Sequence, residues 1–227
     1  ATRPGNPVEI YLATTFGFLV SPDDGGHFYW ICEDAIGYAG TFDPKYRVGA
    51  DGTIYATTFD GLRVSRDGGC TFATATEEAP TTDPGRFAGL WVDAIDLASD
   101  GTVWVATAAS GLPNNVYRSS DGARTFAPAG LASAEIWWKS LRVAPSAPAR
   151  LYVSGYQVTQ LGPDGGTIPP AVHLLRSDDG GANWQPLPTS DLQLATSPLV
   201  LVEGVGRSNP DLVFARSVGA LPPTGDR

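Results

Sequence analysis

The chain has 227 residues, with 15 lysines and arginines against 24 aspartates and glutamates, and a formal net charge of −9. This charge argues against nucleic acids and anionic membrane surfaces as partners, because both carry negative charge themselves. No stretch of eighteen apolar residues occurs, so the sequence predicts no membrane span. The 27 glycines and 19 prolines, among many Val, Thr, Tyr, Phe and Trp residues, favour one all-β domain over residues 1–227.

A turn that contains Gly or Pro, followed by a short apolar strand, occurs five times along the chain. The five segments are residues 6–13, 51–57, 100–107, 149–154 and 209–215. Each has one aromatic residue at a matching position, namely Tyr11, Tyr55, Trp104, Tyr152 and Phe214. Short apolar runs bounded by turn residues are typical of β-strands. We therefore expect five related strands, each the second strand of a repeated unit.

A second motif, Ser-x-Asp-x-Gly-x-x-aromatic, follows four of these strands. Its Ser and Asp side chains can bond to nearby backbone N–H groups, and its glycine supplies the positive φ of a tight turn. The third copy has Ala123 in place of glycine, which predicts a slightly different turn there. We expect these residues to hold their own turns: Ser21, Asp23, Gly25, Ser65, Asp67, Gly69, Ser119, Asp121, Ser177, Asp179 and Gly181.

The repeated motif resembles the Asp-box, or BNR repeat, of β-propellers, a family that includes sialidases, sortilin-like receptors, some endoglucanases and photosystem assembly factors. The segment 59–70 also resembles uncharacterised exported BNR-repeat proteins of bacteria. The resemblance implies an all-β fold, a β-propeller of four-stranded antiparallel blades. Repeats of this kind stack neighbouring units along the chain.

The two ends of the chain differ in their strands. The first unit is expected to lack its first strand, whereas segments 199–205 and 211–217 supply the first two strands of a fifth unit. The sequence thus predicts roughly four and a half blades, from a longer propeller or one completed by another chain. Such an end would expose strand edges for other chains to pair with. The absence of methionine indicates a processed or cut chain.

Loop lengths indicate where a ligand would bind. From the repeated aromatic to the following motif serine, the separation is 10, 10, 15 and 25 residues in successive units. In a four-stranded antiparallel blade these variable connections lie at the end opposite the motif turns, and variable loops on a rigid scaffold often bind ligands. The candidate ligand-binding residues at this loop end are Asp34, Asp60, Asp93, Glu135, Trp137, Trp138 and Lys139.

Three functions fit a ligand-binding surface at this loop end. The first is a binding or scaffold module for a protein or carbohydrate, because no catalytic motif is evident. The second is a glycoside hydrolase, with two of the loop carboxylates about 5 to 10 Å apart and tryptophans stacked on sugar rings. The third is a subunit of an extracellular assembly. A sialidase is not favoured, because the Arg-Ile-Pro motif of that family is absent.

The histidines and cysteines suggest no cofactor. His27 and His173 lie in different segments without metal-ligand spacing, so no metal site is predicted. Cys32 and Cys70 are the only cysteines. An even number of cysteines in a β-protein poor in lysine fits an exported protein, so we expect one Cys32–Cys70 disulfide and a secreted, periplasmic or cell-surface location. The alternative is two reduced thiols in the cytosol.

Overall fold

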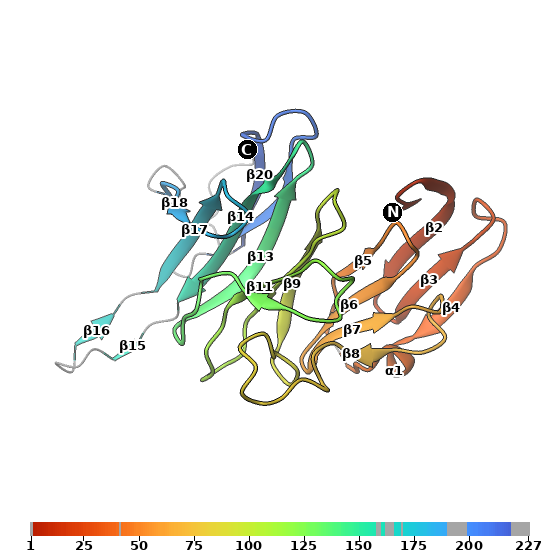
Figure 1. Ribbon diagram of the computed structural model, residues 1–227, viewed down its shortest axis with the longest axis horizontal. Helices are drawn as coiled ribbons and strands as arrows, with labels where there is room; N and C mark the ends of the chain where they lie inside the picture. Colours follow the sequence, from red (N-terminus) through yellow and green to blue (C-terminus); the bar gives the residue numbers. More distant parts are fainter. Residues whose placement is uncertain are drawn as a thin grey trace, which may run out of the picture. The chain divides into compact units, whose positions relative to one another are not determined.

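A computed structural model describes residues 2–40, 42–157, 160–161, 166–168, 170–189 and 199–218 of the chain (Figure 1). These residues form a series of antiparallel sheets in chain order, with one short helix. The chain divides into two compact units. Unit 1 contains the residues up to Val105 together with Tyr117–Ala127, and unit 2 contains Ala106–Val116 and the residues from Pro128 onward.

Four of the sheets have four strands each. The first contains β1 (Thr2–Arg3), β2 (Asn6–Thr14), β3 (Gly17–Ser21) and β4 (Tyr29–Cys32). The second contains β5 (Tyr46–Val48), β6 (Ile54–Thr58), β7 (Gly61–Ser65) and β8 (Ala73–Thr74). The third contains β9 (Val92–Leu97), β10 (Val103–Thr107), β11 (Val116–Ser119) and β12 (Ala127–Pro128). The fourth contains β13 (Ile136–Ala144), β14 (Ala147–Gln157), β17 (Ala171–Ser177) and β18 (Gln185–Pro186).

The remaining elements are small. The helix α1 (Glu33–Ile36) follows β4, and β15 (Gln160–Leu161) pairs with β16 (Thr167–Ile168) between β14 and β17. The last sheet is a hairpin of β19 (Leu199–Val205) and β20 (Val213–Val218). The prediction of four four-stranded units and half of a fifth is confirmed. The first strand of the first unit, expected to be missing, is present as the two-residue β1, paired with β2.

The core of unit 1 forms between the faces of successive sheets. Side chains from the first sheet, including Tyr11, Phe18 and Ile31, share one buried cluster with Ile54 and Ala56 of β6. In a strand, neighbouring side chains point to opposite faces. Tyr55, between those two residues, therefore points the other way and joins a second cluster, whose members from the third sheet include Val103 and Val105. Both faces of β6 are thus buried.

The four repeated motifs fold into turns with one shared hydrogen-bond set, and we call them box turns. In each, the serine hydroxyl donates to the aspartate Oδ1 over 2.7–2.9 Å. The same hydroxyl accepts the backbone N–H four residues after it over 2.8–2.9 Å. Ala123 adopts a φ of 64° and keeps this bond at 2.9 Å, so the third turn follows the others, contrary to the expectation of a different turn.

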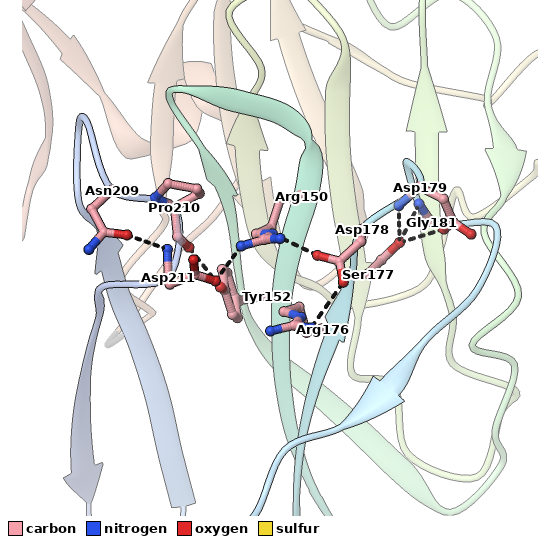
Figure 2. A network of polar contacts seen from close by, with 10 residues as sticks. All are labelled: Arg150, Tyr152, Arg176, Ser177, Asp178, Asp179, Gly181, Asn209, Pro210 and Asp211. Atoms are coloured by element: carbon pink, nitrogen blue, oxygen red, sulfur yellow. Dashed lines mark hydrogen bonds and ion pairs between the residues drawn. The ribbon is translucent and has the colours of Figure 1, made fainter.

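In unit 2, a charged network joins the fourth box turn to the β19–β20 hairpin (Figure 2). The Arg150 Nε lies 2.6 Å from Asp178 Oδ1, and the same guanidinium pairs with Asp211 in the turn of the hairpin. The Tyr152 hydroxyl donates to the Pro210 carbonyl oxygen over 2.7 Å. These contacts attach the hairpin to β14 at the end of the sheet that carries the box turn.

The predicted Cys32–Cys70 disulfide is absent, and both thiols are free. Cys32 ends β4, and Cys70 is exposed in the second box turn. A Cβ placed on Gly69 would lie 2.1 Å from Ile31 Cδ1, so the Ile31 side chain points toward this box turn. Because adjacent strand residues point to opposite faces, the Cys32 side chain points away from the turn that holds Cys70.

Candidate functional site

Three connections of unit 1 meet at the end of the sheets opposite the box turns. They are the segment before β5, the β6–β7 turn and the segment before β9, and Tyr46 at the start of β5 pairs with Ala56 near the end of β6. Strand β9 also contacts both β5 and β6. Each connection contributes an aromatic ring. Together with a tyrosine after α1 they form the aromatic cluster, whose members are Tyr38, Phe42, Phe59 and Trp91.

The rings of the aromatic cluster are tilted against one another. The Phe59 ring centroid lies 4.4 Å from that of Phe42 and 5.0 Å from that of Trp91, with interplanar angles of 47° and 50°. Tyr38 meets Phe42 edge-on at 6.1 Å. Such tilted and edge-to-face contacts are favoured between aromatic rings. Phe59 nevertheless keeps 51% of its surface exposed, so the cluster presents an aromatic surface to solvent.

Exposed carboxylates adjoin the aromatic cluster in the sequence. Asp60 follows Phe59 in the β6–β7 turn, and Asp43 follows Phe42; both residues are exposed. On the buried side, the Tyr46 hydroxyl donates to the Tyr38 hydroxyl over 3.2 Å, and burial raises the pKa of both phenols. The tyrosine hydroxyls therefore stay neutral at physiological pH, and the negative charge of this region comes from the carboxylates.

The long β8–β9 connection, which carries Trp91, is held in place by its own polar contacts. The Arg86 Nη1 donates to the carbonyl oxygens of Thr76, Glu77 and Ala79 over 2.5–2.8 Å. The Thr76 hydroxyl accepts the N–H groups of Phe87 and Ala88, each over 3.1 Å. A loop whose backbone groups are satisfied in this way is ordered before a ligand arrives.

The same connection is joined to the β6–β7 turn. The Gly89 N–H donates to the Asp60 carbonyl oxygen over 2.9 Å, and the Thr58 hydroxyl donates to the Gly61 carbonyl oxygen. These bonds fix the turn that carries Phe59 relative to the loop that carries Trp91.

The predicted loop-end residues of unit 1 have different environments. The structure places Asp60 beside the aromatic cluster and Asp34 on the exposed side of α1. Asp93 is buried in β9, where its Oδ1 lies 3.0 Å from Lys45 Nζ. This ion pair joins β9 to the segment before β5. Asp93 therefore has a structural contact that the sequence alone did not indicate.

The predicted residues of unit 2 form a separate group around the start of β13. Glu135 is exposed, and Lys139 is half-buried. The Trp137 ring is tilted against Tyr156, with 5.6 Å between centroids. Trp138 is buried, and its Nε1 donates to the Leu131 carbonyl oxygen over 3.0 Å, so its faces are occupied by protein. Trp138 fills the core and has no exposed ring for stacking on a ligand.

Sequence reasoning missed Phe42 and Phe59. A signal for Phe59 was available, since the sequence Thr-Thr-Phe occurs in the corresponding turns of the first two sheets, at residues 14–16 and 57–59. An aromatic residue in a turn, where polar residues are usual, points to a binding surface. The copy in the first sheet, Phe16, is equally exposed and meets Trp30 edge-on at 6.2 Å.

Comparison with solved structures identifies the fold. The GH74 xyloglucanase of Xanthomonas campestris is 20% identical over 83% of this chain and 29% of its own, with a TM-score of 0.60. An ancestral GH74 enzyme is 15% identical over 97% of this chain and 30% of its own, with a TM-score of 0.61. Both are β-propellers, and the chain described here repeats their four-stranded antiparallel sheets. The chain has a β-propeller fold.

The likeness extends to the fold alone, because the sequences have diverged to 20% identity or less. The propeller sheets described here span less than a third of the length of either GH74 structure. No protein-family model matches the chain, and no curated protein matches it. Within the described part of the chain, no three His, Cys, Asp or Glu side chains gather as a metal site would require, and no helix is long and apolar enough to cross a membrane.

Proposed function

We propose that this β-propeller is a binding module whose ligand contacts the aromatic cluster at the loop end of unit 1. The observation that carries the proposal is the exposed ring of Phe59, held in a tilted stack with Phe42 and Trp91. A ligand that covered this preformed aromatic surface would gain free energy from the apolar area that it buries. The bonds of Arg86 and Gly89 support a preformed surface.

The proposed ligand is a carbohydrate. Sugar rings present C–H groups that pack on aromatic faces, while their hydroxyls donate hydrogen bonds to carboxylates such as those of Asp43 and Asp60. The name of one similar structure, a xyloglucanase, supports a glucan as the first compound to try. A protein ligand is the other outcome of the same binding test. The location that suits such a ligand is the one proposed from the sequence, outside the cytoplasm.

Glycoside hydrolysis is the second candidate, favoured by the GH74 enzymes among the similar structures. It would need two carboxylates about 5 to 10 Å apart at the bound sugar. Asp93 is engaged with Lys45, which removes one of the predicted carboxylates from this role. Asp60 is the remaining predicted carboxylate beside the aromatic cluster. Binding without catalysis therefore requires fewer assumptions than hydrolysis.

Phe59→Ala tests the proposal, and Phe16→Ala is the matched control. Both rings are 51% exposed and both stand in the turn between the second and third strands of a sheet, but Phe16 lies outside the aromatic cluster. We expect Phe59→Ala to weaken the binding of xyloglucan oligosaccharides, measured by titration calorimetry, roughly tenfold, because a stacked aromatic contact contributes about 1.4 kcal/mol. Phe16→Ala should leave the dissociation constant unchanged.

Two other results would change the proposal. Equal affinity of Phe59→Ala and wild-type protein for every oligosaccharide that binds would rule out the aromatic cluster as the site. Release of reducing ends from xyloglucan by the wild-type protein, lost in Asp60→Asn while binding is retained, would favour the hydrolase instead.

A further inference from the structure

Two carboxylates beside the aromatic cluster have no bonded partner in the part of the chain that the structure describes. Asp43 follows Phe42, Asp60 follows Phe59, and both aspartates are exposed. Neither side chain takes part in a hydrogen bond or an ion pair with a described residue. Carboxylates that are held on a preformed surface and not neutralised there attract positive charge.

Glu33 of α1 adds a third carboxylate near the edge of the cluster formed by Tyr38. Its Oε2 is buried and has no hydrogen-bond partner among the described residues. Burial raises the pKa of Tyr38 and Tyr46 most, and the negative charges of Glu33 and Asp43 raise both pKa values further. Both carboxylates therefore act on this edge of the cluster, where their charges add.

The cations of the same segments are bonded to protein groups. Lys45, in the segment before β5, pairs with the buried Asp93 over 3.0 Å. Arg63 in β7 donates to three protein oxygen atoms over 2.6–3.0 Å. Arg86 in the β8–β9 connection also donates to three, all backbone carbonyl oxygens, over 2.5–2.8 Å. The positive charges of these segments are thus directed into the protein, and the aspartates provide the exposed charge beside the cluster.

The aromatic rings themselves attract positive charge. The faces of aromatic rings carry partial negative charge, so an ammonium group above them is bound, most strongly by tryptophan. Phe59 is half-exposed, and Phe42 and Trp91, against which it is tilted, are half-buried. The cluster with Asp43 and Asp60 therefore combines the two groups that bind an ammonium ion in proteins, aromatic faces and carboxylates.

We propose that the carbohydrate bound at the aromatic cluster is an oligosaccharide of amino sugars whose amines are protonated. This inference rests on the proposed function, because it assumes that a sugar chain binds there. The C–H groups of a sugar ring pack on Phe59, and the ammonium groups of the chain pair with Asp43 and Asp60. A neutral glucan lacks this charge contact, and the same aspartates repel a sugar chain that carries carboxylates.

Titration calorimetry with three tetrasaccharides of the same β-linkage tests this ligand class. They are built from glucosamine, N-acetylglucosamine and glucose, and the titrations are done at about pH 6, where amines keep their proton. We expect the glucosamine tetrasaccharide to bind roughly tenfold more tightly than the glucose one, because it adds ammonium–aromatic and ion-pair contacts. The N-acetylglucosamine tetrasaccharide should lose this advantage, because acetylation removes the positive charge and keeps the sugar ring.

A double variant, Asp43→Asn with Asp60→Asn, removes the two exposed charges and keeps an amide oxygen that accepts sugar hydroxyls. The preference for the glucosamine tetrasaccharide should fall from roughly tenfold to roughly twofold or less, with little change in affinity for the glucose one. Asp100→Asn is the matched control. Asp100 is an exposed carboxylate in the β9–β10 turn, at the other end of the sheet, and the variant keeps the oxygen that accepts the Thr102 N–H. It should keep the full preference.

The other outcomes separate this inference from the proposed function. Equal affinity for the glucosamine and glucose tetrasaccharides, with both weakened by Phe59→Ala, would overturn the amino-sugar ligand and leave the binding function intact. A preference that persists in the double variant would also overturn it, because the charge contact would then lie elsewhere. Binding of none of the three sugars would overturn both proposals. Binding of a lysine tetrapeptide in place of the glucosamine tetrasaccharide would identify a basic peptide as the ligand instead.

Discussion

At the residue scale, the serine of each box turn is the side chain with the most constant role. Its hydroxyl is buried in all four copies, where it donates to the aspartate and accepts a backbone N–H. The aspartate in turn accepts the N–H four residues after it, over 2.8–3.0 Å. The turn is thus satisfied by two side chains of its own, which explains why the motif recurs with fixed spacing.

Ser65→Ala should therefore lower the free energy of unfolding by about 1–3 kcal/mol, because it leaves the Gly69 N–H without its acceptor and removes one of the donors to Asp67 Oδ1. Ser120→Ala, at an exposed position of the third box turn, is the control and should change stability by less than about 0.5 kcal/mol. Urea unfolding of both variants measures the difference. Equal stabilities would show that water replaces the Ser65 hydroxyl in the turn.

At the scale of elements, the β8–β9 connection shows how a long loop is packed onto the sheets. Phe87 is buried in the cluster shared with Tyr117 and Phe126, with ring centroids 5.0 and 4.8 Å away. Gly85 lies close to the backbone of the third sheet, where an added Cβ would be 1.8 Å from the Phe126 carbonyl oxygen. Only a residue without a side chain allows this approach.

Gly85→Ala should accordingly destabilise the protein by about 1–3 kcal/mol, because the backbone of Phe126 or of the loop must shift. Gly204→Ala in β19, where an added Cβ meets nothing within 4 Å, should be neutral or stabilising by up to about 1 kcal/mol. Amide hydrogen exchange will locate the effect. Loss of protection in residues 76–91 is expected for Gly85→Ala, whereas unchanged protection there would mean that the loop accommodates the methyl group.

At the scale of the whole molecule, the four box turns make stability depend on acid pH. Hydrogen bonds from residues four positions on and from the box serines lower the pKa of Asp23, Asp67 and Asp179 to about 2. Burial raises the pKa of Asp121, but bonds from Thr125 and Ser119 outweigh it and lower that pKa as well. Because the pKa values in the folded state lie below those of the unfolded chain, the unfolded state binds more protons in this range.

The stabilisation from these carboxylates is therefore complete above about pH 4 and is lost as the pH falls toward about 2. We expect the free energy of unfolding to decrease over this interval. In Asp67→Asn, the free energy of unfolding should change less with pH, with a slope that corresponds to roughly one proton fewer. This change is separate from any loss of stability at neutral pH. Unfolding curves at closely spaced pH values measure the slope, and an unchanged slope would contradict the folded-state pKa of Asp67.

The sequence alone determined the repeated sheets, the four box turns and the end of the sheets at which loops accumulate. These features depend on local chemistry: alternating apolar residues, glycines at positive φ and side chains that bond within their own turn. The sequence also predicted Asp60 as a candidate ligand-binding residue, because it is a polar residue in a turn at the loop end.

Only the tertiary structure decided which distant side chains meet. Phe42, Phe59 and Trp91 come from three separate connections, and the Lys45–Asp93 pair joins two segments. The direction of a strand residue depends on its exact position in the register, since one step reverses the face. Because of this alternation, the Cys32 side chain points away from Cys70. Packing in three dimensions also buries Trp138, although its neighbour Trp137 stays partly exposed.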